Sequence, residues 1–409
     1  MITVAAPTVL VIGAGPAGLA AALSLRARGV AVTLLEAEEQ GRVRPGSRAL
    51  FVHRDSLRLL EAASPGLGTA IAGYGLVWRV RRTLYRGRQL FERTYPEPLL
   101  GRMPAFTSLR QVDTERFLLQ ACAAAEVQIV WGSRVESVSA SSEGVTVRAA
   151  DGSRWSAAYV IGADGARSTA RRATGIAVSG PPVDAFHVVI DVEADEGSPL
   201  LRERTFHYRH PGLGGRNVLL VPFTGGFQVD VQCRPDDSPA DWGSEEGARR
   251  WLRLVVDDSD AGPIRWASTY RFLRVVADQF TDVHRRVLLI GEAAHLFPPF
   301  GARGMNSGFA DAAVAASAVA EAFRAGTERE RAALIGRFAE VRHGAALRNA
   351  AATERVLAHL MPGPGGRIRQ AAAAVLNPVL PACGRWMESA PYGAAAGPAD
   401  PSGMTRGRY

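Results

Sequence analysis

The segment TVLVIGAGPAGL, residues 8–19, decides the fold, because it joins a short apolar run to three closely spaced glycines. Residues 8–12 are mostly β-branched or aliphatic, a composition typical of a buried parallel strand. After the glycines, residues 19–28 repeat apolar side chains at helical spacing and stop at Gly29. The segment therefore predicts a strand, a tight turn and a helix in immediate succession.

Each glycine of this turn has its own physical task. We expect Gly13 to permit the tight turn, Gly15 to let a pyrophosphate approach the backbone, and Gly18 to let helix and strand pack closely. The phosphates would lie at the positive N-terminus of the helix. A second apolar strand, residues 30–35, ends at Glu36, where an acid can accept hydrogen bonds from ribose hydroxyls. Together these features predict a dinucleotide-binding unit.

Composition narrows the remaining classes of protein. The 409 residues exceed one ordinary core and suit two packed domains. The net charge is +8, but all 48 basic residues are arginines and they are dispersed, which indicates codon bias rather than a patch for nucleic acid. Three distant cysteines, Cys122, Cys233 and Cys383, favour neither disulfides nor a metal site and fit a cytoplasmic protein.

No membrane-spanning or leader segment is expected. The chain enters its first strand after a few residues, without a basic region followed by a long apolar run. The alanine-rich stretch 310–322 is interrupted by Asp311 and Glu321, so we interpret it as a packed helix.

Two later motifs extend the nucleotide site. The stretch IGADGARS, residues 161–168, follows segments that alternate like antiparallel strands. The stretch VLLIGEAAH, residues 287–295, runs into PPFGARGMNSG, residues 298–308. The glycines at 301 and 304 predict a turn that opens a helix from Met305, and such a helix N-terminus can stabilise negative charge on a ligand.

This set of motifs, in this order, resembles the single-component FAD-dependent aromatic hydroxylases of the p-hydroxybenzoate hydroxylase fold. The resemblance covers roughly residues 7 to 345 and is nearest to the subset that includes 3-(3-hydroxyphenyl)propionate hydroxylases. It implies an α/β (α+β) chain: a Rossmann-like FAD-binding domain with an inserted antiparallel-sheet substrate domain and C-terminal helices. The family's thioredoxin-like C-terminal extension is not expected here.

The resemblance also implies domain limits. The FAD-binding domain would comprise residues 1–180 and 281–345, and the substrate domain residues 181–280. C-terminal helices would occupy residues 346–396, and residues 397–409 would form a flexible tail.

The resemblance carries cofactor roles onto individual residues. Arg48 would lie near the FAD diphosphate, Gln111 near the ribityl chain, and Met305 and Asn306 at the flavin pyrimidine edge. Glu292 stands where the family usually has aspartate, so its ribityl contact should be shifted or water-mediated. The full set of implied cofactor-binding residues is Gly13, Gly15, Ala17, Gly18, Glu36, Ala37, Arg48, Gln111, Asp164, Gly165, Arg167, Gly291, Glu292, Pro299, Gly301, Gly304, Met305 and Asn306.

The interrupting segment, residues 181–280, predicts an antiparallel sheet, because residues 186–192, 205–209, 217–221 and 227–232 alternate between turn signals. Its substrate-side candidates are Tyr208, His210, Arg216 and Gln228, and the alternative for each is a solvated strand residue. By the resemblance, Arg216 would lie near the flavin, and a carbonyl of Pro298 or Pro299 would help to deprotonate a phenol. His295 is expected to hold its loop rather than to act as a base.

The resemblance implies a reaction. NAD(P)H, bound transiently, would reduce FAD, the reduced flavin would capture O2, and the hydroperoxide would hydroxylate an electron-rich ring, a phenol or arylamine. Decarboxylative hydroxylation, N-hydroxylation, dearomatisation and Baeyer–Villiger oxidation start from the same intermediate. A non-catalytic FAD-binding protein is the alternative from another class, and the absence of lysine argues against a flavin-dependent halogenase.

This reaction leaves three alternatives open: NADH or NADPH as the reductant, a monomer or a homodimer, and a role in catabolism or in secondary metabolism. Of the two roles we favour secondary metabolism. No nucleic-acid or membrane partner is expected.

Overall fold

A computed structural model describes residues 9–42, 50–97, 101–257 and 259–392. A five-stranded parallel sheet carries the nucleotide motif, with strand order β19 (Val287–Leu289), β11 (Tyr159–Gly162), β1 (Val9–Ile12), β2 (Val32–Leu35) and β7 (Gln128–Val130). β1, β2, β11 and β19 are completely buried, as their continuous apolar sequence predicts.

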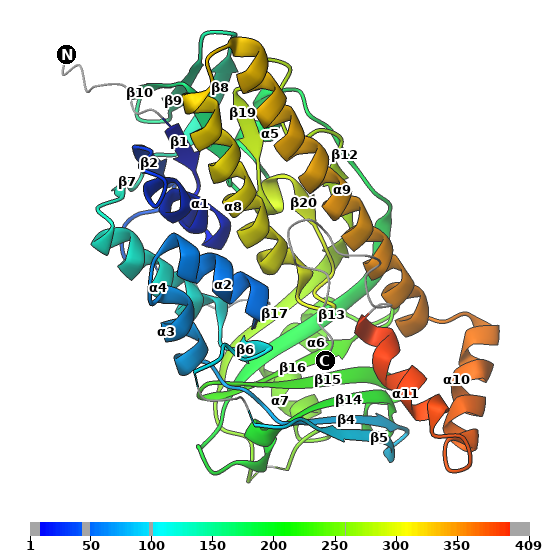
Figure 1. The fold of residues 1–409 in the computed structure, drawn as a ribbon. Coiled ribbons are helices and arrows are strands. Elements are labelled where there is room, and N and C mark those ends of the chain that lie inside the picture. Colours follow the sequence, from blue (N-terminus) through cyan, green and yellow to red (C-terminus); the bar gives the residue numbers. More distant parts are fainter. Residues whose placement is uncertain (1–8, 43–49, 98–100, 258, 393–409) are drawn as a thin grey trace.

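Helices cover this sheet on the side of the N-terminal motif. α1 (Pro16–Arg26) packs against α4 (Gln111–Ala124) and against α8 (Arg303–Arg324), which in turn packs against α9 (Glu328–Leu360). α2 (Arg54–Ala63) and α3 (Leu67–Tyr74) lie next to this group, and α5 (Thr169–Ala173) follows the second motif. Figure 1 shows α1, α5 and α8 above the second, larger sheet.

Three small sheets complete this half of the molecule. They comprise β8 (Val135–Ala140), β9 (Val145–Ala149) and β10 (Arg154–Ala157); β12 (Val178–Ser179), β18 (Val275–Ala277) and β20 (His295–Leu296); and β3 (Phe51–His53) with β6 (Phe106–Ser108).

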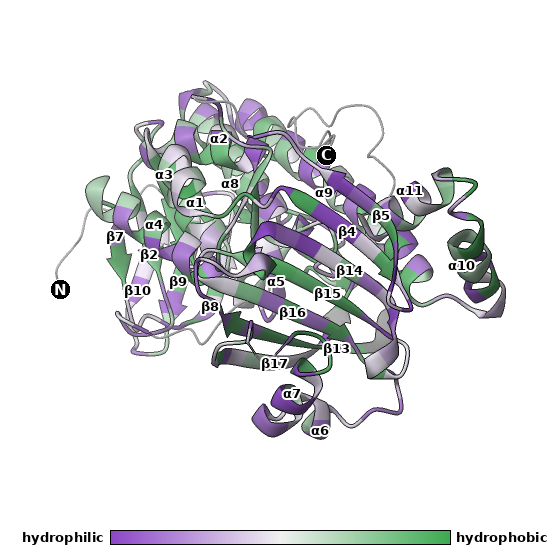
Figure 2. Cartoon of the chain, turned by 90° about the horizontal axis from the view of Figure 1, so that it is seen from below, coloured by the Kyte–Doolittle hydropathy of each residue, from purple (hydrophilic) through white to green (hydrophobic). Residues whose placement is uncertain are grey.

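The large sheet has seven strands in the order β17 (Ile264–Leu273), β13 (Pro182–Glu193), β16 (Gly226–Gln232), β15 (Arg216–Phe223), β14 (Glu203–His210), β4 (Val80–Tyr85) and β5 (Arg88–Thr94). The four strands predicted within residues 181–280 are confirmed as β13 to β16. Figure 2 shows all seven strands side by side, with a largely hydrophobic β13 and a largely hydrophilic edge strand β5.

The large sheet also contains a pairing that the sequence did not predict. β4 and β5 come from the segment 1–180, and β4 joins β14 in parallel, so the sheet is mixed rather than purely antiparallel. On the face away from α1 and α8, α6 (Pro239–Gly243) and α7 (Glu245–Leu252) cover the sheet, and Trp251 and Leu252 share a core with Val188 and Phe227. A segment distant in sequence therefore contributes to the wall beneath the candidate site.

The C-terminal helices begin before the predicted boundary at residue 345. α9 is one continuous helix of 33 residues across that position, started by a capping box between Thr327 and Glu330. α11 (Ala382–Ser389) then packs beside the β4–β5 edge of the large sheet, and α10 (Pro364–Leu376) packs against α11. Short 3₁₀ turns lie at Pro199–Arg202, Pro211–Leu213, Gly291–Ala293 and Ala390–Tyr392. Among the described helices, none is both long and apolar enough to cross a membrane.

Candidate functional site

One cavity of about 1760 Å³ lies between the parallel sheet and the large sheet. It is lined by all three motifs singled out in the sequence and by side chains from one face of the large sheet. Pockets for drug-sized ligands span roughly 300–1,000 Å³. The cavity therefore has room for a dinucleotide and a second molecule at once.

The first motif, residues 13–18, forms a turn that we call the cradle, and the space above Gly15 at its centre is open. Gly13 has a φ of +101°, and a Cβ there would lie 2.6 Å from the carbonyl oxygen of Ala163. A Cβ on Gly18 would lie 1.9 Å from the carbonyl oxygen of Gly13, so helix and strand meet backbone to backbone. Above Gly15, by contrast, a Cβ would meet nothing within 4 Å. The three glycines therefore have the geometry expected of a turn, a close packing contact and a surface for a phosphate.

Small side chains bring the motifs together. A Cβ on Gly291 would lie 2.9 Å from the Cβ of Ala17, and one on Gly308 would lie 3.2 Å from the same atom. α1, the turn after β19 and the start of α8 therefore converge at Ala17, which lines the cavity together with Gly291 and Gly308.

Glu36 lines the same cavity at the end of β2, beside Ala37. Its carboxylate accepts hydrogen bonds from the backbone N–H of Ala14 at 2.6 Å and of Glu38 at 3.0 Å. It also forms an ion pair with Arg42 at 2.5 Å. The acid is thus fixed at the mouth of the cradle, and Arg42 is a neighbour that sequence reasoning missed.

The second motif forms another part of the wall. The carboxylate of Asp164 accepts hydrogen bonds from Ser168 Oγ at 2.5 Å and from the backbone N–H groups of Thr169 and Ala170, and it thereby caps α5. Gly165 has a φ of +78°. Asp164, Gly165 and Arg167 all line the cavity, and Arg167 is exposed.

Behind the third motif, a buried carboxylate holds the loop in place. Asp311 of α8 accepts a hydrogen bond from the backbone N–H of Gly291 at 3.0 Å, and its two oxygens lie 2.7 Å from His295 Nε2 and from Arg342 Nε. Burial alone would raise the pKa of Asp311, but Arg342 and His295 outweigh it and hold that pKa below its ordinary value. His295 stacks on Phe297 and has the structural position expected from the sequence.

The glycine-rich turn places the N-terminus of α8 at the cavity. Gly301 and Ala302 both have left-handed backbones, with φ of +74° and +51°, and the N–H of Ala302 donates to the carbonyl of Pro299 at 2.9 Å. Gly304 and Met305 line the cavity in the first turn of the helix, whose N–H groups have no intrahelical acceptors.

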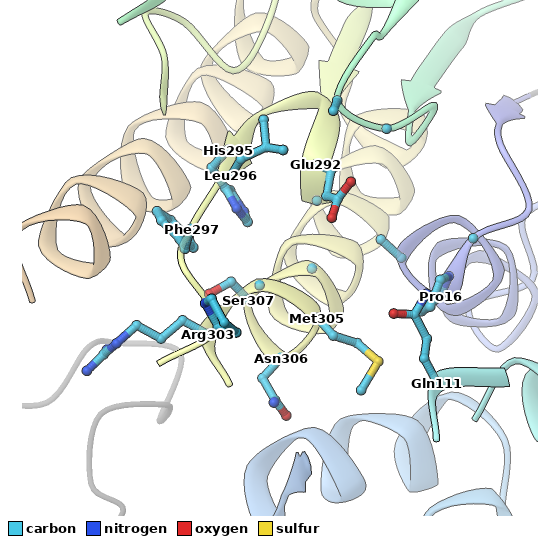
Figure 3. Close-up of a pocket in the computed structure, with 18 of the residues that line it drawn as sticks. Pro16, Gln111, Glu292, His295, Leu296, Phe297, Arg303, Met305, Asn306 and Ser307 are labelled. Atoms are coloured by element: carbon cyan, nitrogen blue, oxygen red, sulfur yellow. The ribbon is translucent and has the colours of Figure 1, made fainter. Parts of the chain in front are cut away.

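Side chains of three elements point into this part of the cavity. Figure 3 shows Glu292, Met305 and Gln111 directed toward one space, while Arg303 extends away from Met305 on the other side of the loop. Gln111, at the start of α4, also donates to Glu115 at 2.8 Å. Glu292 is exposed and lies in the 3₁₀ turn after β19 rather than within the strand.

The side chain of Asn306 makes hydrogen bonds within the protein, whereas that of the neighbouring Met305 points into the cavity. Its Oδ1 accepts hydrogen bonds from the N–H of His53 and from Ser56 Oγ, and its Nδ2 donates to the carbonyls of Phe51 and Ala302. The side chain therefore ties α8 to β3 and α2, and both of its polar atoms have partners within the protein.

The floor of the cavity is the face of the large sheet opposite α6 and α7. Gln228, Asp230 and Tyr270 line this floor with polar side chains. Two buried residues of β13, His187 and Asp191, contact them. Gln228 Nε2 donates to Asp191 Oδ1 at 2.8 Å, His187 Nδ1 lies 2.5 Å from Asp230 Oδ1, and Tyr270 Oη donates to Asp230 Oδ2 at 3.4 Å. Burial raises the pKa of Asp191 to about 6. Of this group, only Gln228 was singled out from the sequence.

Four of the predicted substrate-side residues do not line the cavity. Arg216 makes a bidentate ion pair with Asp237 and packs on Trp242, with 4.3 Å between the guanidinium carbon and the ring centroid. Tyr208 donates to the carbonyl of Met387 at 2.7 Å and lies 2.9 Å from His359 Nε2. His210 is buried beside His207, and Pro298 is buried behind Pro299.

Arg216 points to the face of the large sheet that α6 covers, whereas Tyr208 shares the face of Arg204 and Phe206 but is covered by α9 and α11. Arg48 lies outside the described residues.

The glycine turn with its open space above Gly15 is typical of dinucleotide-binding proteins. The chain belongs to the FAD binding domain family, whose model matches residues 6–348. This match confirms the FAD prediction, and the open place above Gly15 and the helix N-termini fit that cofactor.

Two curated relatives illustrate the similarity. Rifampicin monooxygenase of Streptomyces venezuelae is 29% identical over 315 residues, 74% of this chain and 62% of the relative. The 3-(3-hydroxy-phenyl)propionate/3-hydroxycinnamic acid hydroxylase of Mycolicibacterium smegmatis is 28% identical over 308 residues, 74% of this chain and 53% of the relative. The chain thus spans less than two thirds of the length of either protein, and the predicted resemblance to such hydroxylases is confirmed.

A solved structure shows the same fold. The crystal structure of p-nitrophenol 4-monooxygenase PnpA from Pseudomonas putida superposes with a TM-score of 0.74 at 22% identity, and the match covers 95% of this chain and 99% of that one.

Proposed function

We propose that this protein is an FAD-dependent monooxygenase that consumes NAD(P)H and O2 to hydroxylate an electron-rich aromatic compound. The observation that carries the proposal is the continuity of the cavity, which runs from Gly15 of the cradle past Met305 to Gln228 and Asp230 on the sheet. Both curated relatives described above are named for oxygenation of compounds with aromatic rings.

The residues of the chain have separable tasks in this reaction. The N–H groups after Gly15 would bind the FAD diphosphate at the N-terminus of α1. The N-terminus of α8, at Gly304 and Met305, would stabilise negative charge on the isoalloxazine ring. When bound, FAD supplies the redox chemistry, taking a hydride from NAD(P)H and passing electrons to O2.

The part of the cavity that receives the substrate must exclude water and orient one aromatic ring. Phe206, Leu219 and Phe300 give the chamber apolar walls, and a dry site strengthens every polar contact within it. Asp230, fixed by His187, is placed to accept a hydrogen bond from a hydroxyl group on the ring. Tyr270 Oη donates to the same carboxylate and orients it.

The test uses the purified FAD-loaded protein under air with NADH or NADPH and a panel of phenols, aminophenols and their carboxylic acids. We expect one group of compounds to stimulate NAD(P)H oxidation and to give products heavier by one oxygen atom. A yellow protein that oxidises neither nicotinamide in the presence of any ring compound would overturn the proposal. Loss of carbon dioxide or insertion into a ring ketone would instead identify another oxygenation outcome.

A further inference from the structure

α10 carries large aliphatic side chains that face away from the protein. Five residues of this helix and of the turn that follows it, which we call the aliphatic row, have exposed fractions between 44% and 73%: Ile368, Val375, Leu376, Val379 and Leu380. Figures 1 and 2 both show α10 at the outer edge of the molecule, and in Figure 2 much of it has the colour of hydrophobic residues. Exposed aliphatic residues that lie next to one another, unlike single scattered ones, mark an interaction site.

The two faces of α10 are reversed relative to an ordinary surface helix. Its buried residues are Gln370, Ala373 and Ala374, and the two alanines share a core with residues of α9 and α11. Ile368 and Val375 are seven residues apart and share the opposite face, since Val375 lies roughly 200° around the helix from Ala373. An ordinary surface helix buries its large apolar side chains. Packing within the chain therefore does not account for the aliphatic row.

The charge around the aliphatic row is positive. Residues 355–387 include no aspartate or glutamate. Arg367 and Arg369 adjoin Ile368 in the sequence, so they project on either side of the row, about 100° around the helix from it. Arg367 donates to a backbone carbonyl, and Arg369 packs on the ring of Trp386. Both arginines are exposed, and neither has an acidic partner in the part of the chain that the structure describes.

A second copy of this chain would not complement this surface. A two-fold symmetric contact sets the same patch of both partners against itself, so the arginines beside the row would face arginines without an acid in this segment to pair with. A bilayer that contains acidic phospholipids offers both complements, because its acyl region takes up aliphatic side chains and its phosphates attract guanidinium groups. The flexible stem of arginine reaches such phosphates while aliphatic neighbours lie deeper. The place of α10 at the outer edge of the molecule lets it meet a flat surface.

We propose that α10 and the turn after it form a docking surface for an anionic phospholipid bilayer. The aliphatic row enters the boundary between headgroups and acyl chains, and Arg367 and Arg369 lie at the level of the phosphates. The contact is peripheral, since α10 rests on the bilayer and does not cross it. The sequence did not predict this partner, because the outward position of the row is evident only once the buried face of α10 is known. The inference goes beyond the proposed monooxygenase function and does not depend on it.

Co-sedimentation with vesicles tests the proposal. The FAD-loaded protein is mixed with vesicles of phosphatidylcholine alone, or of equal parts phosphatidylcholine and phosphatidylglycerol, and the bound fraction is measured after centrifugation. We expect at least about tenfold tighter binding to the vesicles that contain phosphatidylglycerol, because arginines near an anionic surface strengthen the attachment. Added salt should weaken this binding, since it screens the attraction. Equal binding to the two kinds of vesicle, or binding to neither, would overturn the proposal.

Matched variants assign the binding to α10. Ile368→Gln combined with Val375→Gln should lower the affinity for anionic vesicles at least about tenfold, because the row loses its aliphatic groups. FAD content and melting temperature should not change, since both side chains are exposed and glutamine is a good helix former. Arg367→Gln combined with Arg369→Gln should remove most of the preference for phosphatidylglycerol. The control Val283→Gln, at a valine that is 90% exposed on the turn before β19, should bind as the unmodified protein does.

The mass of the protein in solution, measured by light scattering without lipid, distinguishes the other occupant. We expect Ile368→Gln combined with Val375→Gln to leave this mass unchanged. If the unmodified protein is a dimer that these substitutions convert to monomers, the row is an interface between two copies of the chain and the proposal is wrong. If the same variant binds anionic vesicles as tightly as the unmodified protein, another surface holds the bilayer and the proposal is also wrong.

Discussion

Asp311 Oδ2 lies 2.7 Å from His295 Nε2, and this contact fixes the loop that carries Glu292 to the first half of α8. The same carboxylate also holds Arg342 of α9 and the N–H of Gly291. All three side chains are almost fully buried. The carboxylate of Asp311 therefore holds the loop at Gly291 and His295 against α8 and α9.

We predict that Asp311→Asn destabilises the protein by about 3 kcal/mol or more, because it removes the buried negative charge that pairs with Arg342 and His295. Urea unfolding measured by circular dichroism gives this value. Glu321→Gln, an exposed acid on the same helix that accepts a hydrogen bond from Ser317, should change stability by less than about 0.5 kcal/mol. Equal effects of the two substitutions would show that the buried network contributes little.

Gly15→Ala and Gly18→Ala should fail in different ways. At Gly15 an added Cβ meets open space within the protein, so the variant should fold normally and lose at least about tenfold in FAD affinity, because the methyl group keeps the diphosphate from the backbone. At Gly18 the Cβ would overlap the carbonyl of Gly13, so the fold itself should be destabilised. FAD titration of the apoprotein, together with thermal melting, separates the two effects. Wild-type FAD affinity in Gly15→Ala would contradict the assigned phosphate site.

Asp191 gives a pH-dependent prediction. Its folded-state pKa of about 6 lies above the ordinary value of 3.8, so the folded protein holds more protons than the unfolded chain between these values. Stability from this group is therefore present at low pH and is lost as pH rises from about 4 to about 6.

Asp191→Asn should remove this loss and gain roughly 2–3 kcal/mol relative to the unmodified protein at pH 7.5, but not at pH 4. Melting temperatures measured at both pH values test the difference. Asp236→Asn, on the exposed turn before α6, is the matched control. A constant difference at both pH values would exclude the titration of Asp191 as its cause.

Asp230→Asn should lower kcat/KM for a phenolic substrate by about tenfold or more, because the amide is a weaker acceptor for a ring hydroxyl than the carboxylate. FAD content should be unchanged, since the side chain lies on the sheet rather than in the cradle. Steady-state NAD(P)H oxidation coupled to product analysis measures the effect. Unaltered kcat/KM would remove Asp230 from the substrate site.

Much of the nucleotide site could be predicted from the sequence because its signals are local. The strand, the three glycines, the helix and Glu36 follow one another within residues 9–36, and each has a steric task that the structure reproduces. The alternation in residues 186–232 also predicted four strands correctly. Such patterns depend on near neighbours, so they survive without knowledge of the whole fold.

The orientation of single strand residues was harder to predict. Arg216 and Tyr208 lie on strands that were predicted correctly, but Arg216 is held by Asp237 and Tyr208 by Met387 and His359. Arg216 points to the other face of the sheet, whereas Tyr208 is on the face of the cavity but is covered by α9 and α11, and only the complete fold supplies these partners.

The sequence alone determined the class of cofactor site, because a tight glycine turn between a buried strand and a helix has few other uses. Only the tertiary structure decided which side chains line the part of the cavity above the large sheet. Arg81, Arg204 and Glu388 are separated by more than a hundred residues from one to the next and meet through the parallel pairing of β4 with β14 and the packing of α11. Contacts between such distant segments leave no periodic signal in the chain, since they are set by the burial of whole elements rather than by local backbone preference.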